Sequence, residues 1–158
     1  VDGLGHGHPA YQAAKSATRY LRSHSSSDLA QVLTKLHDRL RDSVGAAVSL
    51  CWIDLSTGAL RYAAIGNTVF RLQGEASHRL MAMPGTVGGQ IRNPRVDTAQ
   101  LNGDDVLILH TDGISERTNF EDYPQLRYQG VETVADRIVS QYGKSHDDAT
   151  VVVCKLGS

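Results

Sequence analysis

Acidic residues follow or precede apolar stretches at three places in the chain, and their spacing suits metal chemistry. Residues 1–7 read VDGLGHG, residues 107–113 read LILHTDG, and residues 146–150 read HDDAT. An apolar strand that ends in Asp-Gly puts a carboxylate at the rim of a sheet, beside a turn that glycine permits. Carboxylates that converge without Lys or Arg partners repel one another unless a hard divalent cation lies among them. The sequence therefore predicts an oxygen-ligand site for Mg²⁺ or Mn²⁺.

In the first motif, Asp2 is the candidate metal carboxylate, and the glycines after it expose backbone carbonyls as further oxygen ligands. The alternative is a glycine turn in which Asp2 caps a helix. Glycines before a helix also suggest a phosphate loop. However, the motif has no Gly-Lys-Ser/Thr, and its glycines do not complete a dinucleotide fingerprint.

The other two motifs offer Asp112 and the pair Asp147 and Asp148. Asp112 follows the most hydrophobic strand, where a carboxylate is costly to bury unless it is paired or metal-bound. Its alternative role is to cap the next short helix. Adjacent acids in an extended chain point to opposite sides, so only one of the pair is expected to face a site. The alternative for that pair is a simple turn over residues 143–148.

Three further features are secondary candidates. His6 and His8 share a face in an extended segment, but a zinc or nickel carrier would need more ligands nearby. His6 is also a candidate acid group beside the site, with an exposed loop histidine as the alternative. Asn67 follows Gly66, and the glycine-rich loop at residues 85–89 lies in a segment, residues 84–90, that is expected to be mobile. Such loops gate access or meet partners, or serve only as turns.

The bulk composition fits one domain spanning residues 1–158. The chain is 41% hydrophobic and 21% charged, with a formal net charge of −1. This balance provides neither a basic footprint for nucleic acid nor a polybasic membrane patch, and no apolar run reaches the length of a membrane span. Cys51 and Cys154 lie in apolar runs and are predicted to be buried free thiols in a reducing cytosol. A cytoplasmic location follows as an expectation.

Hydrophobic periodicity predicts helices first, then many strands, then a helix and a strand. Ser27 is predicted to cap the second helix. The predicted strands and helices do not alternate, so the order does not favour a Rossmann fold or a barrel. Antiparallel sheets covered by helices, which form an α/β sandwich, fit best. The predicted helices span residues 10–24, 28–42 and 131–143, and the predicted strands span 46–54, 60–66, 68–72, 78–83, 91–101 (an irregular edge), 105–110 and 150–156, with an irregular stretch holding a short helix at 114–128.

Taken in order, these stretches resemble the metal-dependent protein phosphatase superfamily, the type 2C-like Ser/Thr phosphatases. Within it, the resemblance is to the bacterial SpoIIE-like branch and its stressosome phosphatases. It implies a four-layer α-β-β-α sandwich of two mostly antiparallel sheets with a dinuclear Mn²⁺ or Mg²⁺ site. The matching pieces are residues 1–7, 45–47, 65–67, 85–88, 110–114 and 147–150.

The resemblance also assigns roles to residues. It implies that Asp2 bridges both metals, that Gly3 contributes its carbonyl, and that Asp112 and Asp147 are ligands, with Asp148 a weaker candidate. A metal-bridged water would attack the phosphorus of a phosphoserine or phosphothreonine in line. The implied substrates are phosphorylated STAS-type partners in bacterial stress signalling.

Two departures from the family pattern bear on these expectations. Family members have a β-hairpin before the first motif that supplies another acidic ligand, whereas this sequence starts at Val1. If that hairpin is naturally absent, the second metal site is impaired and a sheet edge is uncovered; if it was cut off, the parent protein is intact. Leu4 stands where eukaryotic members have a histidine proposed as general acid, so water or His6 would protonate the leaving group.

The alternative function is a non-catalytic phosphatase-like binding module.

Overall fold

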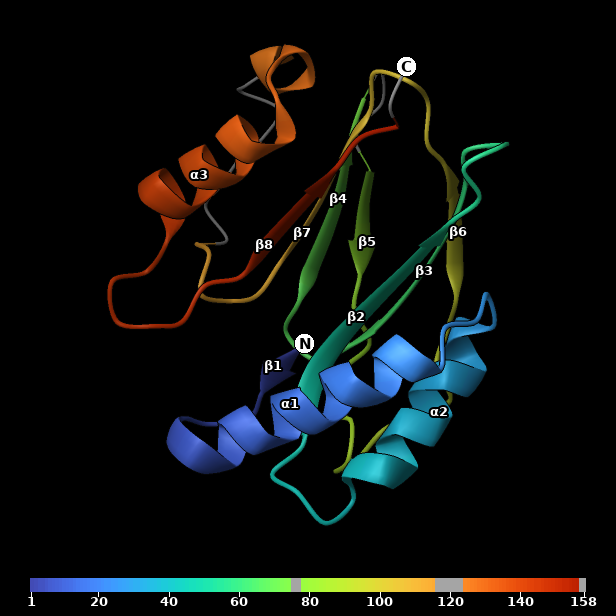
Figure 1. Ribbon diagram of the computed structural model, residues 1–158, viewed down its shortest axis with the longest axis vertical. Helices are drawn as coiled ribbons and strands as arrows, with labels where there is room; N and C mark the ends of the chain where they lie inside the picture. The colour runs from blue at the N-terminus through green and yellow to red at the C-terminus, as the bar shows by residue number, and fades with distance from the viewer. Residues whose placement is uncertain (75–77, 116–123, 157–158) are drawn as a thin grey trace.

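The computed structural model describes residues 1–74, 78–115 and 124–156. Two four-stranded sheets, with antiparallel pairing between their named strands, stack in a sandwich. Helices α1 and α2 cover one sheet and α3 covers the other (Figure 1). The predicted α-β-β-α sandwich is therefore confirmed.

The helices and strands follow the predicted order closely. The helices are α1 (Gly7–Ser23), α2 (Leu29–Leu40) and α3 (Val131–Tyr142), with a 3-10 helix η2 (Pro124–Tyr128). The first sheet has the order β1 (Asp2–Gly3), β2 (Ala46–Ile53), β3 (Ala59–Ile65), β6 (Asp97–Gln100). The second sheet has the order β5 (His78–Met81), β4 (Val69–Gln73), β7 (Val106–His110), β8 (Val151–Cys154).

Three apolar clusters hold the layers together. The first joins α1 and α2 to their sheet, the second lies between the sheets around Tyr62 and Phe70, and the third joins α3 to β7 and β8. In α2 the buried side chains recur at helical spacing, and Leu33, Leu36 and Leu40 are almost fully removed from water. Among the described helices, none has both the length and the apolar character needed to cross a bilayer.

The N-cap of α2 differs from the prediction by one residue. Asp28, not Ser27, occupies the cap, and its Oδ1 accepts a hydrogen bond of 3.0 Å from the backbone N–H of Gln31. A carboxylate three residues before the donor reaches it readily, and its charge suits the helix N-terminus. The backbone carbonyl of Ser27 instead accepts a hydrogen bond from Arg61.

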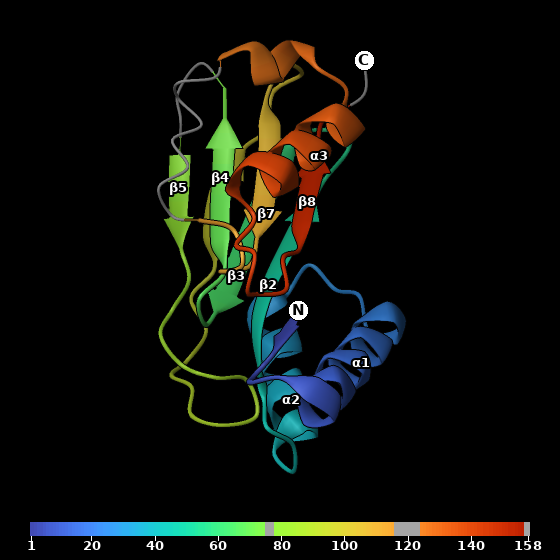
Figure 2. The same ribbon diagram turned by 90° about the vertical axis from the view of Figure 1, so that its left-hand side faces the viewer.

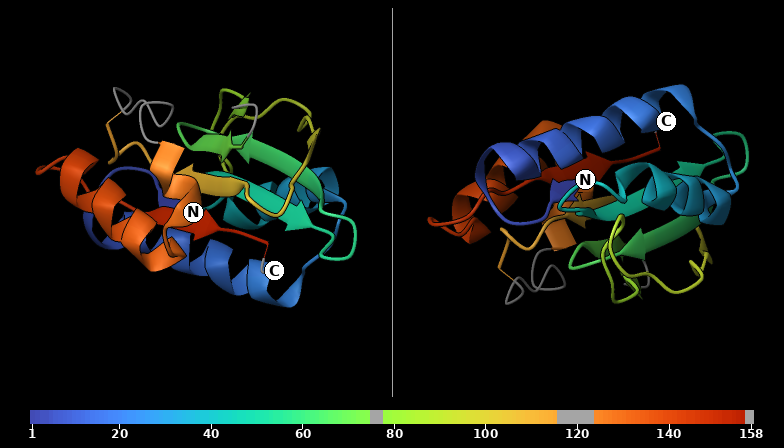
Figure 3. Two further views of the ribbon diagram at one scale, coloured as in Figure 1. Left: turned by 90° about the horizontal axis from the view of Figure 1, so that it is seen from above. Right: turned by 90° about the horizontal axis from the view of Figure 1, so that it is seen from below.

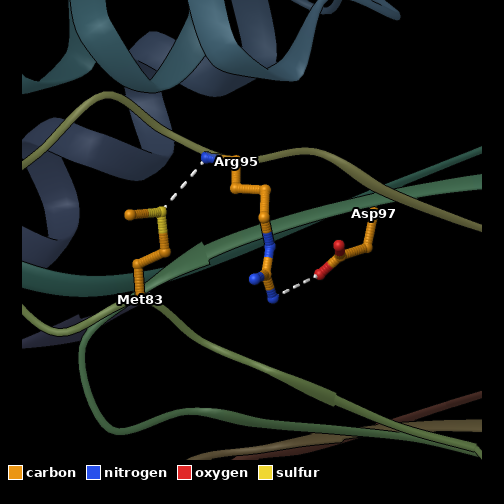
Figure 4. A network of polar contacts seen from close by, with 3 residues as sticks. All are labelled: Met83, Arg95 and Asp97. Atoms are coloured by element: carbon orange, nitrogen blue, oxygen red, sulfur yellow. Dashed lines mark hydrogen bonds and ion pairs between the residues drawn. The ribbon is translucent and has the colours of Figure 1, made fainter.

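The predicted edge strand at residues 91–101 is regular only over β6. Pro94 has no N–H to donate to a ladder, so pairing starts later. The segment before β6 is held by side chains instead (Figure 4): the Arg95 backbone N–H lies 3.1 Å from Met83 Sδ, and the Arg95 guanidinium lies 3.0 Å from Asp97 Oδ2.

The glycine-rich loop makes several contacts with the core. Val87 is fully buried and exchanges two backbone hydrogen bonds of 3.0 Å with Ala46. The Gly88 N–H also donates to His37 Nδ1 at 3.0 Å. An apolar side chain inside a glycine loop thus anchors it to the core.

Of the predicted irregular stretch at 114–128, residues 116–123 lie outside the described part of the chain.

The cysteines are free, as predicted, but each is half-buried rather than buried. Burial, with a smaller effect from Cys154, raises the pKa of the Cys51 thiol to about 12.

Since the thiolate is the reactive form, we expect iodoacetamide at pH 8 to alkylate Cys51 in the native chain roughly 1,000-fold more slowly than in the urea-unfolded chain. Peptide mapping by mass spectrometry measures both rates. Equal rates would contradict this prediction.

Candidate metal centre

Asp2 lies at the edge of the first sheet, next to the start of α1. Strand β1 pairs with β2, so that Asp2 faces Ala47 and Gly3 faces Ala46. A Cβ on Gly3 would lie 2.0 Å from the carbonyl oxygen of Ala10 in α1. Only glycine lets the strand and the helix approach this closely. The Asp-Gly pair therefore places a carboxylate beside the first turns of α1.

Asp112 is positioned where β7 ends, in contact with the segment before β8. The Thr111 N–H donates to the Thr150 carbonyl at 3.1 Å, and the Thr150 N–H donates to Thr111 Oγ1 at 3.0 Å. A Cβ on Gly113 would lie 2.1 Å from the Asp148 carbonyl oxygen. These contacts bring Asp112 next to the Asp147–Asp148 pair.

The predicted site residues come together in one cavity of about 360 Å³. Figure 2 shows the segment leading into β8 beside β1, which is how the two ends of the sequence meet. No lysine or arginine belongs to the described residues that line the cavity. The predicted residues lining it are Asp2, Gly3, His6, Asn67, Asp112, Asp147 and Asp148.

Both members of the acidic pair line the cavity, although only one was expected to. The expectation assumed an extended chain, but these residues follow a turn in which the Asp147 N–H donates to the Lys144 carbonyl at 3.4 Å. A bend changes the alternation of side chains, so adjacent acids can face the same space.

The acids act on one another through their charges. Burial raises the pKa of Asp2, and the charges of Asp112, Asp147 and Asp148 raise it further. A proton or a cation at Asp2 relieves the same repulsion. The carboxylates and the amide of Asn67 are the donors that hard divalent ions prefer, so the residues present fit Mg²⁺ or Mn²⁺.

The arrangement is open rather than closed around an ion. Among the residues that the structure describes, no three His, Cys, Asp or Glu side chains are close enough to hold one ion as they stand. This geometry does not support the alternative of a metal carrier based on His6 and His8. His8 is absent from the cavity lining, and its ring forms a hydrogen bond of 3.1 Å with Gln12. We expect the carboxylates to turn inward when an ion neutralises their repulsion.

The similarity of the sequence to known proteins agrees with this geometry. The family model described as Stage II sporulation protein E (SpoIIE) matches residues 1–157. The chain belongs to the SpoIIE family. It is 22% identical over 163 residues to the phosphoserine phosphatase RsbX of Bacillus subtilis (strain 168), covering 99% of this chain and 78% of RsbX.

Solved structures share the fold of this SpoIIE-family chain. A structure described as the bacterial stressosome, a modular system adapted to control secondary messenger signalling, is 26% identical with a TM-score of 0.83 over 96% of this chain and 80% of that one. RsbX in complex with magnesium is 21% identical with a TM-score of 0.84 over 96% and 76%. The predicted family branch and the phosphatase class are confirmed.

Among the residues that line the cavity, Asn67 forms a side-chain hydrogen bond with one of the acids. It follows β3, and its Nδ2 donates a short hydrogen bond to Asp112 Oδ2 across 45 residues of sequence. Asp112 therefore points at Asn67, and no helix cap of its own is among its described contacts. Tyr11, Ala14 and Thr150 also line the cavity and were not predicted. The signal for the first two was their helical spacing from Gly7.

Replacing Asn67 by alanine is expected to weaken Mg²⁺ or Mn²⁺ binding roughly tenfold, because partners that orient a metal-binding carboxylate contribute about 10–100-fold to affinity. Calorimetric titration of the SpoIIE-family chain measures it. The matched control is Asn93→Ala, on an exposed loop outside the cavity lining. Equal affinities in the two variants would show that Asn67 does not orient Asp112.

Proposed function

We propose that this chain is a Mg²⁺- or Mn²⁺-dependent protein phosphatase that hydrolyses phosphoserine or phosphothreonine on bacterial signalling proteins. The observation that carries the proposal is the convergence of four carboxylates, from three separate segments, on one cavity that no described lysine or arginine lines. The similarity to phosphoserine phosphatase RsbX supports the reaction class.

In this proposal Asp2, Asp112 and Asp147 hold the ion or ions, together with the carbonyl of Gly3. Bound there, one or two Mg²⁺ or Mn²⁺ ions would supply an acidified water and screen the charge of the phosphoryl group. Asn67 holds the carboxylate of Asp112 in place through its hydrogen bond.

Two other residues complete the proposed site. Asp148 adds negative charge at the cavity wall. The exposed His6 lies in the same lining and is the proposed donor of the proton that the leaving oxygen needs.

The proposed substrate is a phosphorylated partner of the STAS type within a stressosome-like assembly, in the cytoplasm. The similarity to a structure described as the bacterial stressosome supports this choice. Residues 1–158 would act as one phosphatase domain.

The test is a calorimetric titration of Mg²⁺ and of Mn²⁺, with p-nitrophenyl phosphate turnover followed in parallel and Asp2→Ala as the control. We expect saturable binding and metal-dependent turnover that are both lost in the control. Turnover that is the same with and without metal, or unchanged in Asp2→Ala, would disprove the proposed mechanism.

A non-catalytic phosphatase-like binding module is the second candidate. It is favoured by one observation: within the described chain no three candidate ligands are grouped closely enough to hold an ion without moving. It predicts a folded domain with weak metal binding and no turnover of p-nitrophenyl phosphate under any metal. Turnover in the titration above would eliminate it.

A further inference from the structure

Helix α1 carries a strip of positive charge. The helix has 17 residues and none of them is acidic. Lys15, Arg19 and Arg22 line a shallow groove along its exposed side, together with Tyr11, Ala14 and Thr18. Figure 3 shows α1 lying along the outside of the molecule. We call these three cations and Tyr11 the basic strip.

The cations of the basic strip are not neutralised by acids in the described part of the chain. The ion pairs found there are Arg41 with Asp38 and Arg95 with Asp97, and neither involves α1. Lys15 Nζ lies 5.3 Å from the ring centroid of Tyr11, which is itself 57% exposed. Since the chain as a whole has a net charge of −1, the strip is a local concentration of charge rather than part of a basic protein.

The basic strip continues directly into the acidic cavity. Tyr11 and Ala14 line both the groove and the cavity of the candidate metal centre. A molecule whose phosphoryl group lies in the cavity therefore has the strip as its next contact in this direction. The strip runs from Tyr11 to Arg22, which is about 16 Å at the rise of an α-helix and matches roughly five residues of extended peptide.

We propose that the basic strip binds an acidic segment of the phosphoprotein substrate, next to the phosphorylated residue. This inference rests on the proposed phosphatase function and adds a substrate class to it. The cations attract the acidic segment and set its register along the helix. This attraction should raise kcat/KM, and the increase should be largest at low salt. An anionic membrane could also be attracted by three cations, but a lipid bilayer would not place a phosphoserine in the adjoining cavity.

The test compares phosphoserine peptides that carry glutamates on the N-terminal side, on the C-terminal side, or glutamines in both places. We expect the native chain to prefer one acidic peptide over the glutamine peptide by roughly tenfold in kcat/KM, as several weak exposed pairs would produce. The preference should disappear in Lys15→Gln/Arg19→Gln/Arg22→Gln and in high salt. Turnover of p-nitrophenyl phosphate should stay unchanged in that triple variant.

The matched control is Lys35→Gln/Arg39→Gln/Arg41→Gln, which removes the same charge from the α2 region. This control should retain the preference for the acidic peptide. Loss of the preference in both triple variants, or in neither, would overturn the proposal. Phosphatidylserine vesicles serve as the competing ligand: if the α1 variant loses vesicle binding while its peptide preference is intact, the strip is a membrane contact.

A labelled, unphosphorylated acidic peptide separates this inference from the proposed function. If the native chain turns over no substrate, the proposed function fails, and fluorescence anisotropy then decides the docking surface by itself. Binding that is lost only in the α1 variant would support the strip as an acidic-peptide site. Binding that is absent in the native chain would refute it.

Discussion

Replacing Asp2 by asparagine is expected to abolish metal-dependent turnover and, at the same time, to stabilise the metal-free chain at neutral pH. The negative charges of Asp112, Asp147 and Asp148 all act on the carboxylate of Asp2 and raise its pKa. Loss of a residue that only orients a ligand costs about 10–100-fold, so loss of a central ligand should lower kcat/KM by more than roughly 100-fold. p-Nitrophenyl phosphate turnover at saturating Mn²⁺ measures it.

The gain in stability follows from the direction of the pKa shift. Burial and neighbouring acids raise the pKa of Asp2 in the folded chain, so the folded state binds its proton more tightly than the unfolded state. The free energy of unfolding therefore falls as the pH rises through that pKa, and the loss is complete above it. Asparagine carries no charge, so its advantage should be largest near neutral pH and vanish below the ordinary aspartate pKa of about 4.

Urea unfolding of the metal-free chains across this pH range measures the effect, and Asp136→Asn on the exposed side of α3 is the matched control. The control should change neither turnover nor the pH dependence of unfolding. If Asp2→Asn lost turnover and stability together, the carboxylate would be part of the fold's own support rather than a metal ligand.

Replacing Gly113 by alanine should cost both stability and metal binding. The added Cβ would lie 2.1 Å from the Asp148 carbonyl oxygen and 2.9 Å from the Ala149 Cα, so the end of β7 and the segment before β8 must separate. The hydrogen bond of 2.8 Å from the Lys144 N–H to the Gly113 carbonyl would be strained as well. We expect a loss of about 3 kcal/mol in unfolding free energy, at the upper end for overpacking.

Gly103 is the control that the chain offers for this prediction. A Cβ there meets nothing within 4 Å, and its φ does not lie in the left-handed region. Gly103→Ala should therefore change the unfolding free energy by less than about 0.5 kcal/mol and leave metal affinity unaltered. Equal effects at the two glycines would mean that the close approach at Gly113 does not hold the acidic segments together.

Much of the fold could be predicted because local patterns agree with it. The leucines of α2 recur at helical spacing, and the buried strand β7 is apolar up to its last residue, His110, so both were expected within a few residues of their observed bounds. The cap of α2 was misplaced by one residue, since Ser27 and Asp28 are both good caps and only the observed bond to Gln31 separates them. The fixed position of Val87 depends on a pairing with Ala46 that no local pattern encodes.

The site could be predicted as a set of residues but not as an arrangement. Each Asp-Gly motif marks a carboxylate at a close backbone approach, which is a local signal. The bond from Asn67 to Asp112 and the turn that lets Asp147 and Asp148 face the same cavity arise from contacts distant in sequence. The basic strip of α1 was missed because its cations are spaced like those of any solvated helix face.

The position of Asp2 and Asp147 near opposite ends of the sequence has a consequence for synthesis of the protein. The cavity is lined by both carboxylates, so the nascent chain cannot complete it until the segment that carries Asp147 has left the ribosome. At about 5–20 residues per second, that delay lasts on the order of ten seconds. Until Asp147 has emerged the growing chain lacks the complete cavity, so metal binding at this site is expected to begin only after that point.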